Sequence, residues 1–168
     1  MFKLSRRMQL IFDHLLPGKP VWDFCCDHGY LGLNAYESGQ FSEVHFVDQV
    51  PHIVEQLENR FQAEYFREDS LALAAFHSRP GEELQQPVSG TVVITGVGAH
   101  TILKIVQSLM ENGLLSADRL ILGPQRDEQW LCDLLRKTLP NTFKTDCEML
   151  SVEERGRNRK LLIFDKIL

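Results

Sequence analysis

The sequence has few cysteines, no long apolar run and no excess of positive charge, and each shortage excludes a class of protein. The four cysteines, at positions 25, 26, 132 and 147, show no C-x-x-C spacing, and the first two are too close together to staple a fold. We therefore expect no metal site and no disulfide framework. The longest apolar runs, such as residues 161–164, are far too short to span a bilayer, and the N-terminal segment has no signal-peptide core. We expect a cytoplasmic protein with no membrane partner.

The charge balance is acidic but uneven. The 168 residues carry 18 lysines and arginines against 23 acidic side chains, a formal net charge of -5, which argues against a protein whose whole surface grips nucleic acid. With 43% hydrophobic residues, a chain of this length builds one sizeable core, so we expect a single domain over residues 1–168. Two local basic groups lie near the chain ends, and a solvated surface is the simpler explanation of both. They are Lys3, Arg6 and Arg7, and Arg155, Arg157, Arg159 and Lys160.

Short apolar runs alternate with amphipathic segments, which predicts a repeated strand and helix pattern. Apolar residues from Leu4 to Leu15 recur at helical spacing, so an opening helix precedes Pro17. The predicted strands are 21–24, 44–47, 63–66, 91–95 and 119–122. The predicted helices between and after them are 30–38, one that begins at Pro51, a short one at 71–76, 101–111 and 128–139, with a polar loop at 77–89.

The end of the chain breaks this rhythm. Residues 143–152 and 160–167 resemble two strands, and the polar turn 153–159 between them is too short for a crossover helix. They must therefore pair as an antiparallel hairpin. Five strand-helix units followed by a hairpin predict an α/β fold with a doubly wound, mostly parallel, seven-stranded sheet.

Chemistry-bearing residues follow four of the predicted parallel strands. They are the segment Cys25 to Gly29, then Asp48, Asp69, and the segment Thr95 to Gly98. Ligands of such sheets bind beyond the carboxyl ends of the strands, so we expect these four loops to converge on one crevice. An acid about two dozen residues after the first strand is well placed to accept hydrogen bonds from ribose hydroxyls. The pattern therefore predicts a cofactor that contains a nucleoside.

The first loop narrows the choice of cofactor. It reads Asp23-Phe24-Cys25-Cys26-Asp27-His28-Gly29, and only the last glycine of the usual acid-x-Gly-x-Gly-x-Gly pattern is present. Asp27 places a negative charge where the pyrophosphate of a dinucleotide would lie, which disfavours NAD and suits a cationic cofactor such as a sulfonium. The adjacent cysteines are better explained as small buried apolar residues than as nucleophiles.

Four motifs in order resemble one family. The segments LSRRMQLI, DFCCDHGYLG, VVITGVGAHTI and LILGPQ are similar to pieces of the TrmK family of S-adenosylmethionine-dependent tRNA adenine-22 N1-methyltransferases. The matching family pieces read approximately L-S-x-R-L, D-I-G-S-D-H-x-Y-L-P, I-A-G-M-G-G and L-I-L-Q-P. The resemblance covers nearly the whole chain and implies a Rossmann-like class I methyltransferase fold, the cofactor S-adenosyl-L-methionine, and tRNA or another structured RNA as partner.

The resemblance also implies roles for individual residues. Asp48 would hold the ribose hydroxyls and Asp69 would face the adenine amino group of the cofactor. Catalytic positions near the methyl group and the target base would be Asp27, His28, Tyr30 and Arg6, with Tyr30 stacking on an unpaired adenine. The implied cofactor residues are Asp23, Cys25, Asp27, Gly29, Asp48, Gln49, Asp69, Ser70, Gly96, Val97 and Gly98.

The chain also departs from the family pattern. Cys25 replaces a glycine, Gly32 a proline, Ala99 a glycine and Gly123 a glutamine, and the sequence ends at the hairpin, without the helical C-terminal segment usual in the family. Two alternatives to a tRNA methyltransferase therefore stay open. The chain is then either a catalytically degenerate binding or regulatory module marked by Cys25, or a methyltransferase with a non-RNA substrate. Nothing in the sequence indicates the oligomeric state.

Overall fold

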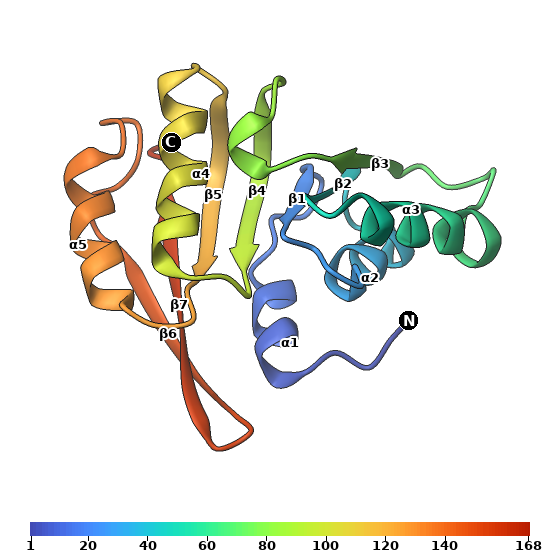
Figure 1. The fold of residues 1–168 in the computed structure, drawn as a ribbon, viewed down its shortest axis with the longest axis horizontal. Coiled ribbons are helices and arrows are strands. Elements are labelled where there is room, and N and C mark those ends of the chain that lie inside the picture. The colour runs from blue at the N-terminus through green and yellow to red at the C-terminus, as the bar shows by residue number, and fades with distance from the viewer.

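A computed structural model describes all residues, 1–168, and contains one seven-stranded sheet with the strand order β3-β2-β1-β4-β5-β7-β6 (Figure 1). Strands β1 to β5 are parallel, and β7 is antiparallel to both β5 and β6. The predicted doubly wound sheet with a C-terminal antiparallel hairpin is thus confirmed. None of the helices combines the length and the apolar character that a membrane span requires.

The elements up to residue 60 follow the predicted pattern closely. Ser5 caps the opening helix by accepting a hydrogen bond from the Met8 N–H, and Gly39 closes the second helix in the left-handed conformation. Pro51 stands in the first turn of the third helix, where its missing N–H costs nothing. The elements are α1 (Arg6–Asp13), β1 (Val21–Phe24), α2 (Tyr30–Ser38), β2 (Glu43–Asp48) and α3 (Pro51–Arg60).

The third strand is not where the sequence pattern placed it. Residues 63–66 fall largely in a π-helical extension of α3, η1 (Phe61–Tyr65), and the segment predicted as a short helix supplies the strand β3 (Leu73–Ser78). Both segments are short and apolar, and the one that pairs in parallel with β2 becomes the strand. The β3 to β4 connection contains only the short 3₁₀ turn η2 (Gly81–Glu83), so this unit has no crossover helix.

Three of the four strands in the second half of the chain are longer than predicted, and the first strand of the hairpin is shorter. The remaining elements are β4 (Val88–Thr95), α4 (Ala99–Glu111), β5 (Leu115–Gly123), α5 (Glu128–Thr138), β6 (Glu148–Glu154) and β7 (Arg157–Asp165). Phe143 forms only an isolated bridge with Lys166, so the first hairpin strand begins later than expected and the turn shrinks to Arg155 and Gly156.

Helices cover the two faces of the sheet unequally. Helices α4 and α5 pack on one face over β1, β4, β5 and β7, and α1, α2 and α3 pack on the other. On the first face, near β2 and β3, the Trp22 ring stacks on the imidazole of His45 with centroids 3.7 Å apart, and His77 stacks beside both. These flat rings cover part of the sheet where the β3 to β4 connection supplies no helix.

Candidate functional site

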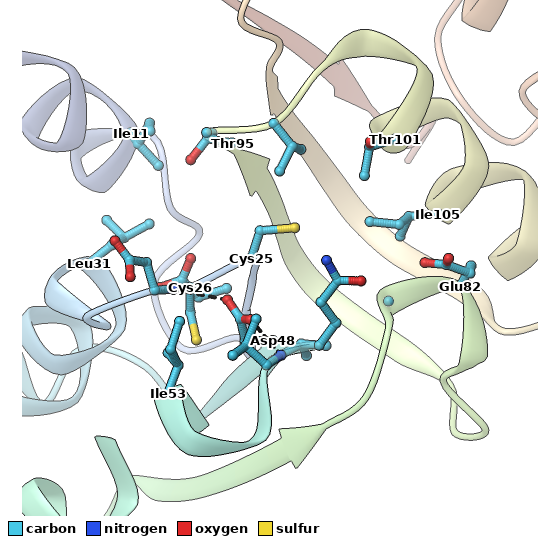
Figure 2. Close-up of a pocket in the computed structure, with 18 of the residues that line it drawn as sticks. Ile11, Cys25, Cys26, Leu31, Asp48, Ile53, Glu82, Thr95, Thr101 and Ile105 are labelled. Carbon is cyan, nitrogen blue, oxygen red and sulfur yellow. Dashed lines mark hydrogen bonds between the residues drawn. The ribbon is translucent and has the colours of Figure 1, made fainter. Parts of the chain in front are cut away.

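A cavity of about 570 Å³ opens at the carboxyl ends of the central parallel strands. The cavity lies between β1 and β4, which are neighbours in the sheet. From β1 the chain continues to β2 on one side, and from β4 it continues to β5 on the other side. Sheets of this kind bind ligands at the point where the strand order reverses. Figure 2 shows its wall, with Cys25 and Asp48 facing Glu82 and Ile105 across the opening. Four carboxylates line it, from Asp23, Asp27, Asp48 and Glu82, against two cationic side chains, from Arg7 and Lys104.

The loop after β1 forms one wall in an unusual backbone conformation. Cys25 and Asp27 have φ values of 56° and 48°, and Gly29, the cap of α2, has 70°. Only glycine adopts this left-handed region without a penalty. The loop is held by hydrogen bonds from the Cys26 N–H to the Val47 carbonyl (3.3 Å) and from the Gly29 N–H to the Cys26 carbonyl (2.8 Å). Strained non-glycine residues of this kind cluster at functional sites.

Asp48 stands at the end of β2 and joins two loops. Its carboxylate accepts the N–H of Asp27 at 3.3 Å and the N–H of Val50 at 3.0 Å. These bonds fix the side chain at the cavity wall, while the carboxylate keeps further lone pairs for a ligand. The adjacent Gln49 also lines the cavity.

Asp23 lies at the floor of the cavity and is only 5% exposed. Its carboxylate accepts the N–H of Gly32 at 3.3 Å. Burial raises the pKa of Asp23 to about 7, because the hydrogen bond from Gly32 only partly offsets the loss of water and the nearby Asp48 adds repulsion. The cavity therefore holds a group that exchanges its proton near neutral pH.

The two cysteines of the loop are unsuited to nucleophilic chemistry. Burial raises the pKa of the Cys25 thiol to about 12 and raises that of Cys26 further, and the negative charges of Asp23 and Asp48 act in the same direction. The thiolate is the reactive form of cysteine, so both remain neutral thiols at physiological pH.

The glycine turn after β4 forms the opposite wall. Thr95, Gly96 and Val97 line the cavity, whereas Gly98 caps α4 and is not among the lining residues. Gln125, beyond β5, holds this turn through its backbone N–H to the Val97 carbonyl and its side-chain amide to the Gly96 carbonyl, both at 3.0 Å.

Asp69 and Ser70 do not lie at the cavity. They precede β3, and because Leu73 pairs with Glu43 at the amino end of β2, they lie at the opposite edge of the sheet from Asp48. This placement follows from the displaced third strand. Their expected contact with the cofactor is therefore not supported by the geometry.

Glu82 is the acid that follows β3 at the cavity, and it is not among the residues predicted from the sequence. Its carboxylate pairs with the Lys104 ammonium at 2.8 Å, which lowers the pKa of Glu82. A Cβ atom on the neighbouring Gly81 would lie 2.8 Å from Phe24, so glycine allows the chain to pass close to the core here. The Gly81-Glu82 pair inside a polar loop is the signal that could have located this site residue.

Two predicted catalytic residues lie beside the cavity but outside its lining. His28 is exposed, with its Nε2 3.8 Å from the Asp27 carboxylate, and its carbonyl accepts a hydrogen bond from Arg60. The Tyr30 ring packs edge-on against Phe2, with centroids 4.8 Å apart, and the Arg60 guanidinium lies over both rings. Asp27 alone of this group lines the cavity.

Arg6 does not line the cavity but a separate surface depression that also contains Lys3, and its neighbour Arg7 lines the cavity. Successive residues of a helix differ by about 100° in direction, and Arg7 shares a face of α1 with Ile11, which lines the same wall. The pattern L-S-x-R-L aligned with LSRRM places its arginine at position 7, which is the residue that lines the cavity.

Strand order, the reversed seventh strand and an acidic cavity at the switch point together define a class I methyltransferase fold. The family described as "Methyltransferase domain" matches residues 4–157, and the chain belongs to this family. No curated protein matches the sequence.

Solved structures confirm the resemblance to TrmK at the level of the fold. The chain is similar to the B. subtilis M1A22 tRNA methyltransferase TrmK, at 18% identity and a TM-score of 0.81, over 99% of this chain and 68% of that one. It is also similar to M. capricolum TrmK in complex with S-adenosyl-homocysteine, at 15% identity and 0.77, over 98% and 70%. A Streptococcus pneumoniae protein in complex with S-adenosyl-L-methionine matches at 22% identity and 0.80, over 98% and 73%.

Proposed function

We propose that the cavity binds S-adenosyl-L-methionine and that the chain is an active methyltransferase. The observation that carries this proposal is the Asp48 carboxylate, fixed at the end of β2 by the N–H groups of Asp27 and Val50, where it can accept hydrogen bonds from the two ribose hydroxyls. The excess of carboxylates in the cavity suits a sulfonium cation and repels a pyrophosphate. Two of the three solved neighbours contain this cofactor or its demethylated product.

The remaining lining residues fit the other parts of the cofactor. Ile53 and Ile105 provide apolar walls for the adenine ring, and Glu82, in place of the expected Asp69, stands where a carboxylate can accept from the adenine amino group. Cys25 and the turn at Gly96 and Val97 also line the cavity and would contact the bound cofactor there. Asp27 lies on the β1 side, where its negative charge favours the sulfonium, and Asp23 contributes there in its ionised form.

We further propose N1 of an adenine in tRNA as the methyl acceptor. Two solved neighbours are described as TrmK, and one of these as an M1A22 tRNA methyltransferase. The N1 lone pair of adenine is free at neutral pH, and the cofactor supplies a methyl group that is already a strong electrophile. The protein therefore needs to align the reactants and exclude water rather than remove a proton. Asp27, at the cavity wall, is placed to stabilise the positive charge that the methylated ring acquires.

Calorimetric titration with S-adenosylhomocysteine tests cofactor binding directly. We expect micromolar binding by the wild type and a loss of roughly 10- to 100-fold in Asp48→Ala, because a hydrogen bond to a charged group contributes about 1.5–3 kcal/mol. Asp146→Ala, which removes an exposed carboxylate outside the cavity, is the matched control and should bind as the wild type does. Equal affinities for Asp48→Ala and the wild type would refute the site. Methylation of unmodified tRNA, with the modified base identified by mass spectrometry, then tests the acceptor.

One observation favours a second candidate, the non-catalytic binding module. Cys25 adopts a left-handed conformation at a position where its side chain lines the cavity and occupies space that a glycine would leave free. A chain that gives no heat with S-adenosylhomocysteine, and no thermal shift at millimolar concentration, would support this candidate over the enzyme.

A further inference from the structure

The two basic groups found at opposite ends of the sequence come together on one side of the molecule. Helix α1 packs against β6, and the Arg7 guanidinium lies 3.7 Å from the Glu154 carboxylate. Residues of both segments, among them Lys3, Arg6 and Val152, line one surface depression. In Figure 1 the β6–β7 hairpin extends past the carboxyl ends of β4 and β5 on the side of α1. This arrangement places both basic groups on the side of the molecule where β4 and β5 end.

The register of the hairpin determines which arginines face the cavity side. Arg157 pairs with Glu154 and Arg159 with Val152, and residues directly opposite one another in an antiparallel pair project from the same face. Glu154 is bound to Arg7 of α1, and Arg7 lines the cavity, so this face looks toward the cavity mouth.

A second contact ties the hairpin to the cavity rim. The Arg159 guanidinium donates a hydrogen bond at 3.4 Å to the carbonyl of Gln125. Gln125 is the residue whose own N–H and side chain hold the turn at Gly96 and Val97. The hairpin is therefore connected to both walls of the opening, through Arg7 on one side and through Gln125 on the other.

At the tip of the hairpin, Arg155 adopts a left-handed backbone conformation that glycine, asparagine and aspartate adopt more readily than arginine. Arg155 and Gly156 form a two-residue turn with φ values of 50° and 71°. Such a turn requires positive φ at both central positions and prefers Asn-Gly or Asp-Gly. Because a left-handed conformation costs a non-glycine residue roughly 1–2 kcal/mol, relieved in part by Asn or Asp, stability alone does not explain an arginine here.

We propose that this surface, formed by Arg155, Arg157 and Arg159 of the hairpin with Lys3 and Arg6 of the N-terminal segment, binds the phosphate backbone of an RNA whose target base enters the cavity. The inference rests on the proposed function. The cavity itself is acidic and repels a polyanion, so the affinity must come from cationic side chains at its rim. Arg7 pairs with Glu154, the acid that lies directly opposite Arg157 in the hairpin, and so offsets its negative charge.

Fluorescence anisotropy with unmodified tRNA over a range of salt concentrations tests the surface, using Arg155→Asn and Arg155→Asn/Arg157→Gln. Each arginine that contacts a phosphate should reduce the slope of log K against log salt by about 1, and the double variant should bind at least tenfold more weakly at low salt. Arg155→Asn should at the same time unfold at a higher temperature, because asparagine suits the turn. The matched control is Arg136→Gln/Lys137→Gln, which removes two cations from the last turn of α5 and should leave the slope unchanged.

Opposite movement of stability and RNA affinity in Arg155→Asn would support a binding role, since a purely structural residue would change both in the same direction. Equal salt slopes for the wild type and the double variant would overturn the proposal, and so would competition by polyglutamate as effective as competition by tRNA. Calorimetry with S-adenosylhomocysteine separates this inference from the proposed function. A chain that binds tRNA through the hairpin but does not bind the cofactor product would refute the enzyme and leave the RNA surface standing.

Discussion

Because Cys25 has a left-handed backbone conformation, we predict that a glycine at this position makes the protein more stable than an alanine does, which is the reverse of the usual order. At most positions alanine is more stable than glycine by about 0.4–1 kcal/mol, because glycine has more freedom to lose on folding. At φ 56° the Cβ atom of alanine is penalised by roughly 1–2 kcal/mol, and glycine avoids that penalty. The two effects together make Cys25→Gly more stable than Cys25→Ala by about 0.5–1 kcal/mol.

The comparison of these two variants removes the other contributions of the side chain. Both lose the sulfur atom and its packing against the core, so those terms cancel in the difference. Urea unfolding measures the difference directly, and for a chain of this length about 1 kcal/mol corresponds to roughly 2–4 °C in Tm. Cys132, which is buried within α5, provides the control. In this helix the free energy of unfolding of Cys132→Ala should be higher than that of Cys132→Gly by about 1 kcal/mol.

A result in which Cys25→Ala is as stable as Cys25→Gly would refute the reasoning, since it would mean that the loop does not hold residue 25 in the left-handed region. If Cys25→Gly is more stable than Cys25→Ala, the folded loop holds residue 25 in the strained left-handed conformation. Cofactor titration of Cys25→Gly would then tell whether the cysteine also obstructs the cavity.

Two further predictions concern buried groups. Burial raises the pKa of Asp23 from an ordinary value of 3.8 to about 7 in the folded chain, so the folded state binds more protons between these values and stability falls as pH rises from about 4 to 7. Asp23→Asn should therefore gain stability relative to the wild type as pH rises through this window, and a pH-independent difference in urea midpoints would contradict the assignment. Gly32→Ala should unfold more easily by about 1–2 kcal/mol despite the better helix propensity of alanine, because its Cβ would lie 2.3 Å from the buried Phe46 ring. Unchanged stability in calorimetric melts would show that Phe46 can move aside.

The sequence pattern predicted those parts of the site that depend on local order along the chain. Cys25, Asp27, Asp48 and Gln49 directly follow buried strands whose apolar runs are unambiguous, and the parallel sheet then brings the strand ends together. The hairpin was predictable because too few residues remained for anything else. These inferences needed only strand identity and the geometry of a parallel sheet.

The errors arose where the answer depended on pairing or on helical phase. Two apolar segments competed for the third strand, and only the pairing of Leu73 to Ser78 with β2 decides between them. That pairing places Glu82 rather than Asp69 at the cavity. A shift of one residue along α1 separated Arg6 from Arg7, since a single step turns a side chain by about 100°. Strand pairing is not visible in a single sequence, whereas the phase of α1 follows from the spacing of its apolar residues and from the L-S-x-R-L motif, both of which favour Arg7.

The stacked rings of Trp22, His45 and His77 mark a part of the sheet that is covered by helices on one face only. Over β1, β4 and β5 the sheet is enclosed between helices, whereas Leu73 and His77 of the edge strand β3 have a helix on one side only. An outer strand with one uncovered face lacks a hydrogen-bonding neighbour on one edge and much of the apolar contact that opposes local opening. Fluctuations of the native state should therefore begin at β3, and Glu82 lies only a few residues beyond it along the chain. The wall of the cavity that carries Glu82 should therefore move more easily than the other walls. Asp23 and Asp48 lie on β1 and β2, which are paired with other strands on both edges.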